Sequence, residues 1–158
     1  MDTVAPVLAP GTLAAFKPVT GELLYVPAYS SIYNASARRS LALAVTLSVR
    51  NTDPARTLVL RSAKYFDTGG KLLKEVVTHP RALSPLATFE YVVDLTDLSG
   101  GSGANFVVEW VSDAADVSAP LVETVNLQTV SGQGVSFSSR AVVIKRLSFG
   151  PQLPPMSP

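Results

Sequence analysis

Apolar and polar residues alternate most regularly between residues 41 and 49. One set of alternate positions is branched and apolar, with Ala, Thr and Ser between its members: Leu41, Leu43, Val45, Leu47 and Val49. Because successive side chains of a β-strand point to opposite faces, this pattern predicts a strand with one buried face. The Asn-Thr-Asp-Pro sequence at 51–54 predicts a turn after it, since Asn and Asp bond their own backbone and Pro presets φ.

Turn-forming residues divide the rest of the chain into further short apolar segments. Besides 41–49, the predicted strands are residues 22–27, 57–66, 71–77, 87–95, 106–111, 121–130 and 135–147. No segment holds a 3.6-residue period, and strands do not alternate with helices. About seven or eight strands separated by turns favour an all-β, antiparallel β-sandwich of the immunoglobulin-like or fibronectin-like kind over a closed barrel. Trp110 is expected in its core.

The two ends of the chain are expected to lie outside the sandwich. The N-terminal apolar run is cut by Pro6, Pro10 and Gly11, lacks the basic region of a signal peptide and is too short to span a bilayer. The C-terminal residues are rich in proline, which cannot pair inside a sheet. We therefore expect an extended N-terminal arm at 1–21, a sandwich domain at 22–147 and a proline-rich tail at 148–158.

Composition argues against several classes of function. Charged residues make up 16% of the chain, and 13 Lys and Arg balance 12 Asp and Glu. That leaves no excess of positive charge for a nucleic-acid backbone. The absence of cysteine excludes disulfides, thiol nucleophiles and iron–sulfur ligation, and a single histidine argues against most metal patterns. No cofactor is expected.

Charge is distributed unevenly along the chain. Residues 38–74 contain eight basic and two acidic residues, whereas residues 75–137 contain one basic and eight acidic residues. Two interpretations are open: opposed surface patches suited to oriented docking, or mixing of the charges as distant strands interleave.

Three features resemble catalytic or binding motifs, and each has a simpler explanation. His79 is the sole candidate general base of its type, but no Gly-x-Ser-x-Gly elbow accompanies it and Pro80 favours an extended loop there. The Ser-Gly-Gly-Ser-Gly run at 99–103 lacks the third glycine of a dinucleotide fingerprint and predicts a flexible turn between strands. A hydrolase built on His79 is therefore the least favoured function, and no catalytic residues are assigned.

Aspartates gather in two predicted loops. Asp94 with Asp97, and Asp113 with Asp116, are candidate oxygen ligands for calcium. The Asp-x-Asp-x-Asp-Gly spacing of an EF-hand is absent, however, and paired aspartates commonly cap turns. We therefore predict no metal site.

Aromatic residues and the two arms form the candidate interaction surface. Tyr25, Tyr29 and Tyr33 recur every four residues, but Pro27 forbids a regular helix through them. They serve either as an extended docking segment, because interfaces favour Tyr, or as cover for a sheet edge. The arms add apolar residues to the predicted surface: Phe16, Phe149, Pro151, Pro154 and Pro155.

Several segments together resemble a bacterial family known as domain of unknown function 3124, over about residues 22–144. They are Tyr-Val-Pro-Ala-Tyr-Ser-Ser-Ile-Tyr at 25–33, Leu-Ser-Val-Arg-Asn-Thr-Asp at 47–53, Tyr-Phe-Asp at 65–67, Ser-Gly-Gly-Ser-Gly-Ala-Asn-Phe-Val-Val-Glu-Trp at 99–110 and Ser-Phe-Ser-Ser-Arg at 136–140. The resemblance implies a small bacterial protein of the periplasm or cell envelope and brings no activity or catalytic set. The missing export signal keeps a cytoplasmic location open.

Three functions remain as hypotheses. The first is a non-catalytic accessory or scaffolding subunit that binds other proteins, on the periplasmic side of a membrane protein complex, because few charges and apolar arms favour protein contacts. The second is a small-ligand or carbohydrate-binding module that uses exposed aromatic rings as stacking platforms. The third is the hydrolase.

Overall fold

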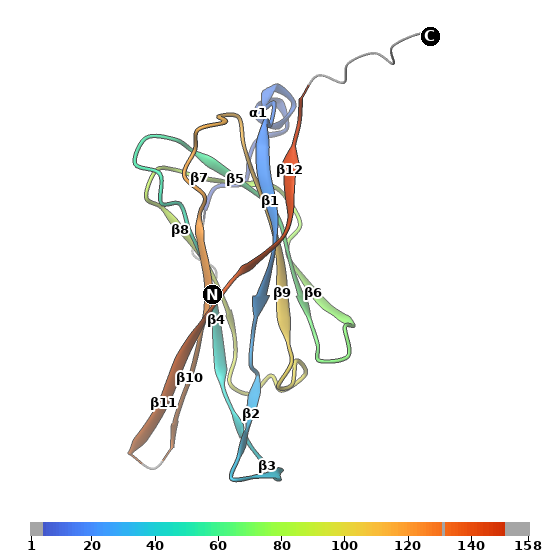
Figure 1. Ribbon diagram of the computed structural model, residues 1–158, viewed down its shortest axis with the longest axis vertical. Helices are drawn as coiled ribbons and strands as arrows, with labels where there is room; N and C mark the ends of the chain where they lie inside the picture. The colour runs from blue at the N-terminus through green and yellow to red at the C-terminus, as the bar shows by residue number, and fades with distance from the viewer. Residues whose placement is uncertain (1–4, 131, 151–158) are drawn as a thin grey trace.

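The computed structural model describes residues 5–130 and 132–150 and confirms an all-β antiparallel sandwich (Figure 1). Its larger sheet has the order β12-β1-β9-β5-β6, with β7 also paired to β5: β12 (Val142–Ser148), β1 (Thr20–Pro27), β9 (Asn105–Ser112), β5 (Leu58–Phe66), β6 (Leu72–Val77) and β7 (Arg81–Leu83). The second sheet has the order β11-β10-β4-β8: β11 (Gln133–Arg140), β10 (Leu121–Val130), β4 (Ala44–Arg50) and β8 (Thr88–Val93). A two-stranded ribbon extends beyond both: β2 (Ser31–Asn34) and β3 (Ser36–Ala42).

The core lies between the two sheets, where the predicted alternation places it. Val45, Leu47 and Val49 of β4 are fully buried, and Phe106 and Val108 of β9 join the same cluster from the other sheet. Trp110 is buried there as well. Inward-facing apolar residues from two sheets thus form one continuous core, as expected of a sandwich.

The described residues contain twelve strands rather than about eight, for two reasons. The predicted strand at 135–147 is two strands, because the chain leaves the second sheet after Arg140 and joins the first at Val142. At the crossing, the Ala141 N–H donates to the Val122 carbonyl at 2.9 Å. The other additions are short: β2, β3 and β7. Alternation marks a strand but not the sheet to which it belongs.

The predicted turns have the expected chemistry. The side-chain N–H groups of Asn51 donate to three backbone carbonyls, and Asp53 accepts backbone N–H groups from Ala55 and Arg56. Gly70 has a φ of +83°, which places it in the left-handed region that glycine tolerates.

The described part of the N-terminal arm packs on the sandwich itself. The Leu8 N–H donates to the Pro80 carbonyl at 2.9 Å, and the Ala82 N–H of β7 donates to the Pro6 carbonyl at 3.1 Å. A six-residue helix, α1 (Pro10–Ala15), interrupts the extended path that the sequence predicted. Proline suits the first turn of a helix because its missing N–H has no partner there. Strand β1 begins at Thr20, inside the predicted arm.

Among the described residues, no helix has the length and apolarity needed to cross a bilayer.

Ion pairs connect the basic and the acidic parts of the sequence. Nitrogen–oxygen distances are 3.2 Å between Arg61 and Glu109 and 3.8 Å between Lys64 and Glu75. Each pair joins a residue of 38–74 to one of 75–137, so the charges mix as distant strands interleave.

Candidate functional site

Two hairpins diverge at one end of the sandwich and leave a groove between them (Figure 1). Strand β10 pairs with β4 only as far as Leu127, which lies opposite Ala44. It continues to pair with β11 as far as Val130, which lies opposite Gln133. Beyond Leu127 the β10–β11 hairpin therefore separates from the β2–β3 ribbon. Strand β3 of this ribbon directly precedes β4 in the chain, so the ribbon forms the other wall of the groove.

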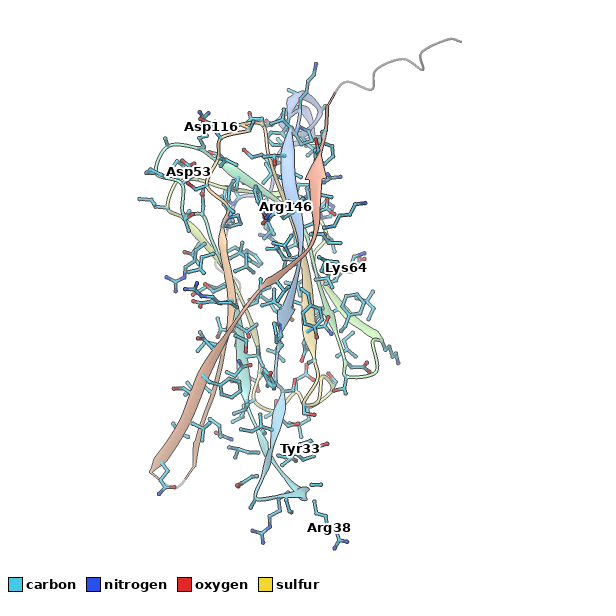
Figure 2. The ribbon with its side chains drawn as sticks, in the orientation of Figure 1. Tyr33, Arg38, Asp53, Lys64, Asp116 and Arg146 are labelled. Carbon is cyan, nitrogen blue, oxygen red and sulfur yellow. The ribbon has the colours of Figure 1, made fainter. Side chains whose placement is uncertain are left out.

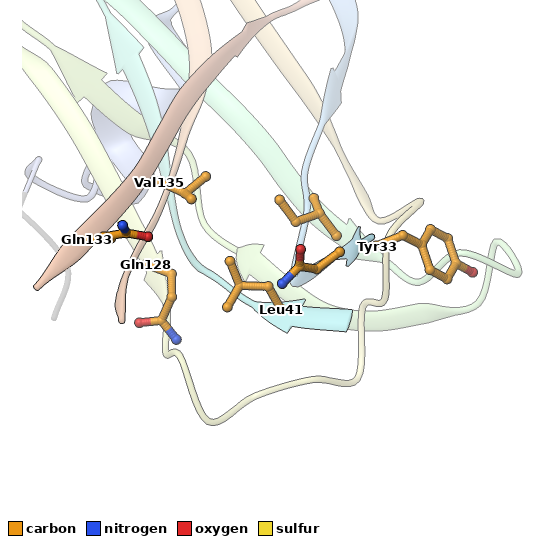
Figure 3. A pocket seen from close by; sticks show the side chains of 7 residues that line it. Tyr33, Leu41, Gln128, Gln133 and Val135 are labelled. Atoms are coloured by element: carbon orange, nitrogen blue, oxygen red, sulfur yellow. The ribbon is translucent and has the colours of Figure 1, made fainter. Parts of the chain in front are cut away.

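The groove between the hairpins has a volume of about 550 Å³. We call it the fork groove, and seven residues line it: Ile32, Tyr33, Asn34, Leu41, Gln128, Gln133 and Val135. Figure 3 shows Leu41 facing the β10–β11 side, while the ring of Tyr33 is directed away from the centre. The lining consists of aliphatic, amide and phenol groups. Such a surface recognises shape and hydrogen-bonding groups rather than supplying a carboxylate, imidazole or amine.

Buried polar groups fix the base of the fork groove. The Thr124 hydroxyl donates to the Pro27 carbonyl at 2.6 Å, and the Asn126 side-chain oxygen accepts the Tyr29 N–H at 3.1 Å. Thr124 and Asn126 are both fully buried. The ring of Tyr29 packs edge-on against Phe137 with centroids 5.1 Å apart. These contacts attach the β10–β11 hairpin to the segment that leads from β1 into β2.

A second set of contacts attaches the β2–β3 ribbon to the larger sheet. The hydroxyls of Ser30 and Tyr65 share a hydrogen bond of 2.6 Å, and the Leu43 N–H donates to the Ser30 carbonyl at 2.9 Å. Burial raises the pKa of the Tyr65 phenol above its ordinary value, because the charged form is poorly solvated there. Both hairpins thus start from rigid positions. The turn at 99–103 packs on this cluster through Gly100, which is buried.

One backbone edge of β10 is open toward the fork groove. Val130 and Gln133 flank a two-residue turn, so alternation along the strand directs the Thr129 N–H away from β11. The described strands offer it no partner on that side, because pairing with β4 ends at Leu127. The N–H donates instead to the side-chain oxygen of Gln128 at 2.9 Å, and Gln128 lines the groove.

Cationic side chains mark the end of the β2–β3 ribbon. Arg38 and Arg39 are exposed there, and Figure 2 shows Arg38 at its extremity. Neither arginine forms an ion pair with another described residue. No Asp or Glu occurs between Glu22 and Asp53 or after Glu123. The β2–β3 ribbon and the part of the β10–β11 hairpin beyond Glu123 therefore contain no acidic side chain.

The structure does not gather the three predicted tyrosines into one cleft. Tyr33 is 67% exposed at the rim of the fork groove, and Tyr29 packs at its base. Tyr25 is 37% exposed on β1, opposite Val142 of the edge strand β12. One of the three thus borders a groove, one supports it, and one lies beside a sheet edge.

The predicted aromatic residues of the two arms meet at the other end of the sandwich. Phe16, which follows α1, and Phe149, which follows β12, line one pocket of about 220 Å³ together with Val59 and Val111. The Arg61 guanidinium lies over the Phe149 ring, 5.7 Å from its centroid. Three further residues of the predicted surface lie outside the described residues: Pro151, Pro154 and Pro155.

The other sequence candidates occupy turns. His79 is exposed in a loop, where its Nδ1 shares a hydrogen bond of 3.0 Å with the Thr78 hydroxyl. Asp94 accepts the backbone N–H and the hydroxyl of Thr96, and these two bonds lower the pKa of its carboxyl. Asp116 pairs with Arg56 at 2.9 Å. No group of three or more metal-ligating side chains occurs within residues 5–130 and 132–150.

Sequence reasoning did not identify most of the residues that line the fork groove. The alternation predicts Leu41 on the buried face of a strand, and the polar members Asn34, Gln128 and Gln133 carry no motif. A signal is present in the charges, since all seven residues that line the groove fall in the two segments without Asp or Glu, 23–52 and 124–158. The charge pattern indicates a common surface only once the fold is known, because the two segments are distant in sequence.

Comparison with known proteins confirms the resemblance seen in the motifs and adds no activity. A family described as "Protein of unknown function (DUF3124)" matches residues 21–144. No curated protein matches the chain. A solved structure described as "Crystal Structure of Thermotoga maritima 1070" is 13% identical, with a TM-score of 0.42, and the alignment covers 77% of this chain and 92% of that chain.

Proposed function

Because the chain belongs to the family described as protein of unknown function (DUF3124), which names no activity, we propose a function from the surface that its fold creates. The protein is a non-catalytic accessory or scaffolding subunit. It binds another protein in the fork groove, between the β2–β3 ribbon and the β10–β11 hairpin.

The fork groove is the observation that carries this proposal. Its volume of about 550 Å³ falls within the range of binding sites, and its walls combine apolar groups with amides. Hydrogen bonds at Thr124 and Asn126 hold its base, so a partner does not have to order the hairpins on binding. Preorganised surfaces of this kind lose less entropy on association.

The non-catalytic part of the proposal rests on the chemistry of the lining. General acid–base catalysis needs a titratable group within hydrogen-bond reach of the substrate, and neither His79 nor any of the paired aspartates lines the fork groove. The Asp94 and Asp116 carboxylates bond to a turn and to an arginine, respectively. Their observed contacts are structural.

A small-ligand or carbohydrate-binding module is the alternative function. Tyr33 is the aromatic residue at the fork groove, and it has the exposure that a stacking platform needs. Its ring points away from the groove centre, however, and Tyr25 and Tyr29 lie elsewhere (Figure 3). The pocket between Phe16 and Phe149, at about 220 Å³, is smaller than common ligand sites of ~300 Å³ or more. These observations favour the protein partner.

The periplasmic side of a membrane protein complex is the proposed location, and the family resemblance supports it. Fractionation of the native host, with the full-length protein followed by antibody, tests this separately from the binding role. Recovery in the periplasmic or envelope fraction is expected, and recovery in the cytoplasm alone would contradict the location.

Site-specific photocrosslinking tests the binding role. A benzoylphenylalanine residue replaces Tyr33 on one hairpin or Gln133 on the other, with the protein made at its native level in its own host. Leu86, which is 67% exposed and lies near Asn51 and Ala87 at the opposite end of β4, is the control position. We expect one protein to be crosslinked from both groove positions and not from Leu86. Equal products from all three positions, or none from the groove, would contradict the proposal.

A further inference from the structure

We propose that the occupant of the fork groove is an extended, apolar segment of a partner protein with acidic residues beside it, an inference that rests on the binding role proposed above. Three independent features of the groove define this chemistry. They are the open backbone edge of β10, the aliphatic lining and the two unpaired arginines of the β2–β3 ribbon.

The open edge of β10 selects an extended backbone. Residues 128–130 pair with β11 on one side only, so the opposite side presents the backbone groups of a strand that β4 no longer covers. The Thr129 N–H is satisfied by the neighbouring Gln128 side chain, a local bond that a carbonyl of an incoming strand can replace. Addition of a strand to an exposed edge is a recurrent mode of peptide recognition.

The aliphatic lining selects apolar side chains. Ile32 and Leu41 are directly paired across the β2–β3 ribbon, and Val135 faces the groove from the other hairpin. A strand inserted between them would place alternate side chains against Leu41 and Val135. Gln128 and Gln133 add amide groups that hydrogen-bond a backbone without requiring charge.

Charge at the groove selects acidic neighbours. Arg38 and Arg39 have no ion-pair partner among the described residues. The β2–β3 ribbon and the part of the β10–β11 hairpin beyond Glu123 contain no Asp or Glu that would compete or repel. Complementary charge at an interface sets orientation and raises the association rate more than it raises affinity. The acidic residues should therefore lie at the end of the segment that passes the ribbon's turn.

A polypeptide fits these features better than a lipid surface does. The aliphatic residues Leu41 and Val135 face into the fork groove, whereas the ribbon's turn is formed by Asn34, Ala35 and Ser36. A membrane-inserting tip would instead carry its apolar groups at the extremity. The edge strand β12 of a second copy of the chain is also a poor occupant of the fork groove. Its Lys145 and Arg146 would lie close to Arg38 and Arg39 of the ribbon and be repelled by them.

Selection from a library of random octapeptides displayed on phage tests the inference with the full-length protein. We expect the enriched peptides to carry apolar residues at alternate positions and Asp or Glu toward one end. The Arg38→Glu/Arg39→Glu variant should bind the best peptide about fivefold or more weakly, and should enrich basic ends instead of acidic ones. The control variant, Lys71→Glu/Lys145→Glu, has the same change in net charge away from the groove and should bind within about twofold of wild type.

The aliphatic requirement is tested with Val135→Asp, which alters a side chain that is 39% exposed and should leave the fold intact. Loss of peptide binding with an unchanged melting temperature supports the inference. Enriched peptides without an acidic preference would overturn the inference while leaving the binding role standing, whereas no enrichment of any groove-dependent peptide would count against both.

Two further measurements on the same protein test for other occupants of the fork groove, a lipid surface and a second copy of the chain. If the protein sediments with vesicles of phosphatidylglycerol and phosphatidylethanolamine, and Arg38→Glu/Arg39→Glu reduces this binding, the occupant is a lipid surface and not a polypeptide. If analytical ultracentrifugation shows a dimer that Val135→Asp converts to a monomer, the occupant is a second copy of the chain. Either result overturns the inference.

Discussion

The indole N–H of Trp110 donates to Oε2 of Glu22 at 3.2 Å, from β9 to the neighbouring strand β1. The other oxygen of the carboxylate, Oε1, accepts from the Arg146 guanidinium at 3.2 Å, across the other edge of β1. Glu22 is 8% exposed, whereas the Arg146 side chain is 82% exposed. The Glu22 carboxylate therefore satisfies the buried indole N–H of Trp110. It also binds the solvated Arg146 guanidinium, which attaches the edge strand β12 to β1.

Replacement of Glu22 should cost more stability than replacement of Arg146. In Glu22→Gln, the new amide turns an N–H toward one of the two donors, and a buried group left unsatisfied costs about 1–3 kcal/mol. Arg146→Ala removes a largely solvated partner and should cost about 0–1 kcal/mol. Urea unfolding, with unchanged slope, measures both free energies. Equal losses would show that the Trp110 bond contributes nothing.

Gly100 is expected to tolerate no side chain while Tyr65 keeps its hydroxyl. A Cβ at this position would overlap the Tyr65 oxygen and lie 2.6 Å from Ser30 Oγ. Gly100→Ala should therefore destabilise the protein by about 1–3 kcal/mol, the usual cost of overpacking. Gly101→Ala is not a matched control, because Gly101 has a positive φ. Gly11→Ala is, because a Cβ there meets nothing within 4 Å.

A double-mutant cycle separates this clash from a general effect of the substitution. Tyr65→Phe removes the overlapping oxygen, so Gly100→Ala should cost less in the Tyr65→Phe background than in wild type. The cost should not vanish, since Ser30 Oγ remains close. Additive free energies of unfolding would show that the turn relaxes away from Tyr65.

The alternation of residues 43–49 is sufficient to predict a strand with one buried face. Leu43, Val45, Leu47 and Val49 are all fully buried, because a strand's side chains must follow its pleat. Leu41 continues the same alternation but belongs to β3 and lines the fork groove. The chain changes strand partner at Leu43, because β3 pairs with β2 up to Ala42 and β4 pairs with β10 from Ala44. The local sequence contains no sign of this change.

The fork groove was not predictable from local patterns because it results from where strands part. Its two walls come from residues 32–41 and 128–135, which no short-range periodicity relates. The sheet change at Ala141 is equally hidden, since residues 135–147 contain no Gly, Pro, Asn or Asp that would mark a break between β11 and β12. Residue types indicate what a strand buries, whereas partner choice depends on packing across the whole domain.

Asp53 should make stability depend on pH in the acid range. Its carboxylate accepts backbone N–H groups from Ser118, Ala55 and Arg56, and these bonds, the Ser118 bond first, lower the pKa of Asp53 below its ordinary value. A lowered folded-state pKa contributes stability above the unfolded pKa of about 4 and loses it as pH falls through the folded value. Asp53→Asn should thus lower the melting temperature at pH 7.

The same comparison at low pH identifies the cause. As pH falls through the lowered folded-state pKa of Asp53, the wild-type carboxyl becomes protonated, so the gap in melting temperature between wild type and Asp53→Asn should narrow. Asp113→Asn alters an exposed carboxylate and serves as the control at both pH values. A gap in melting temperature that stays constant from pH 7 down to the most acidic pH at which the protein still folds would mean that shape rather than charge fixes this turn.

Leu86 should be more stable as glycine, although it is a large apolar residue. It has a φ of +62° in the turn closed by the Ala87 N–H and the Ser84 carbonyl at 3.0 Å, with Pro85 before it. Glycine is the usual residue at this position of a type II turn, because a Cβ in the left-handed region costs about 1–2 kcal/mol. Leu86 is 67% exposed, so little burial is lost on replacement.

Two substitutions at this position separate backbone strain from loss of the side chain. Leu86→Gly removes the strain but adds freedom to the unfolded chain, at about 0.5–1 kcal/mol, so a net gain of up to about 1 kcal/mol is expected. Leu86→Ala removes the same side chain but keeps the Cβ, and should give no gain. Thermal and urea unfolding of the two variants measure the difference. If alanine stabilises as much as glycine, then exposure of the leucine, and not its backbone, is the unfavourable feature.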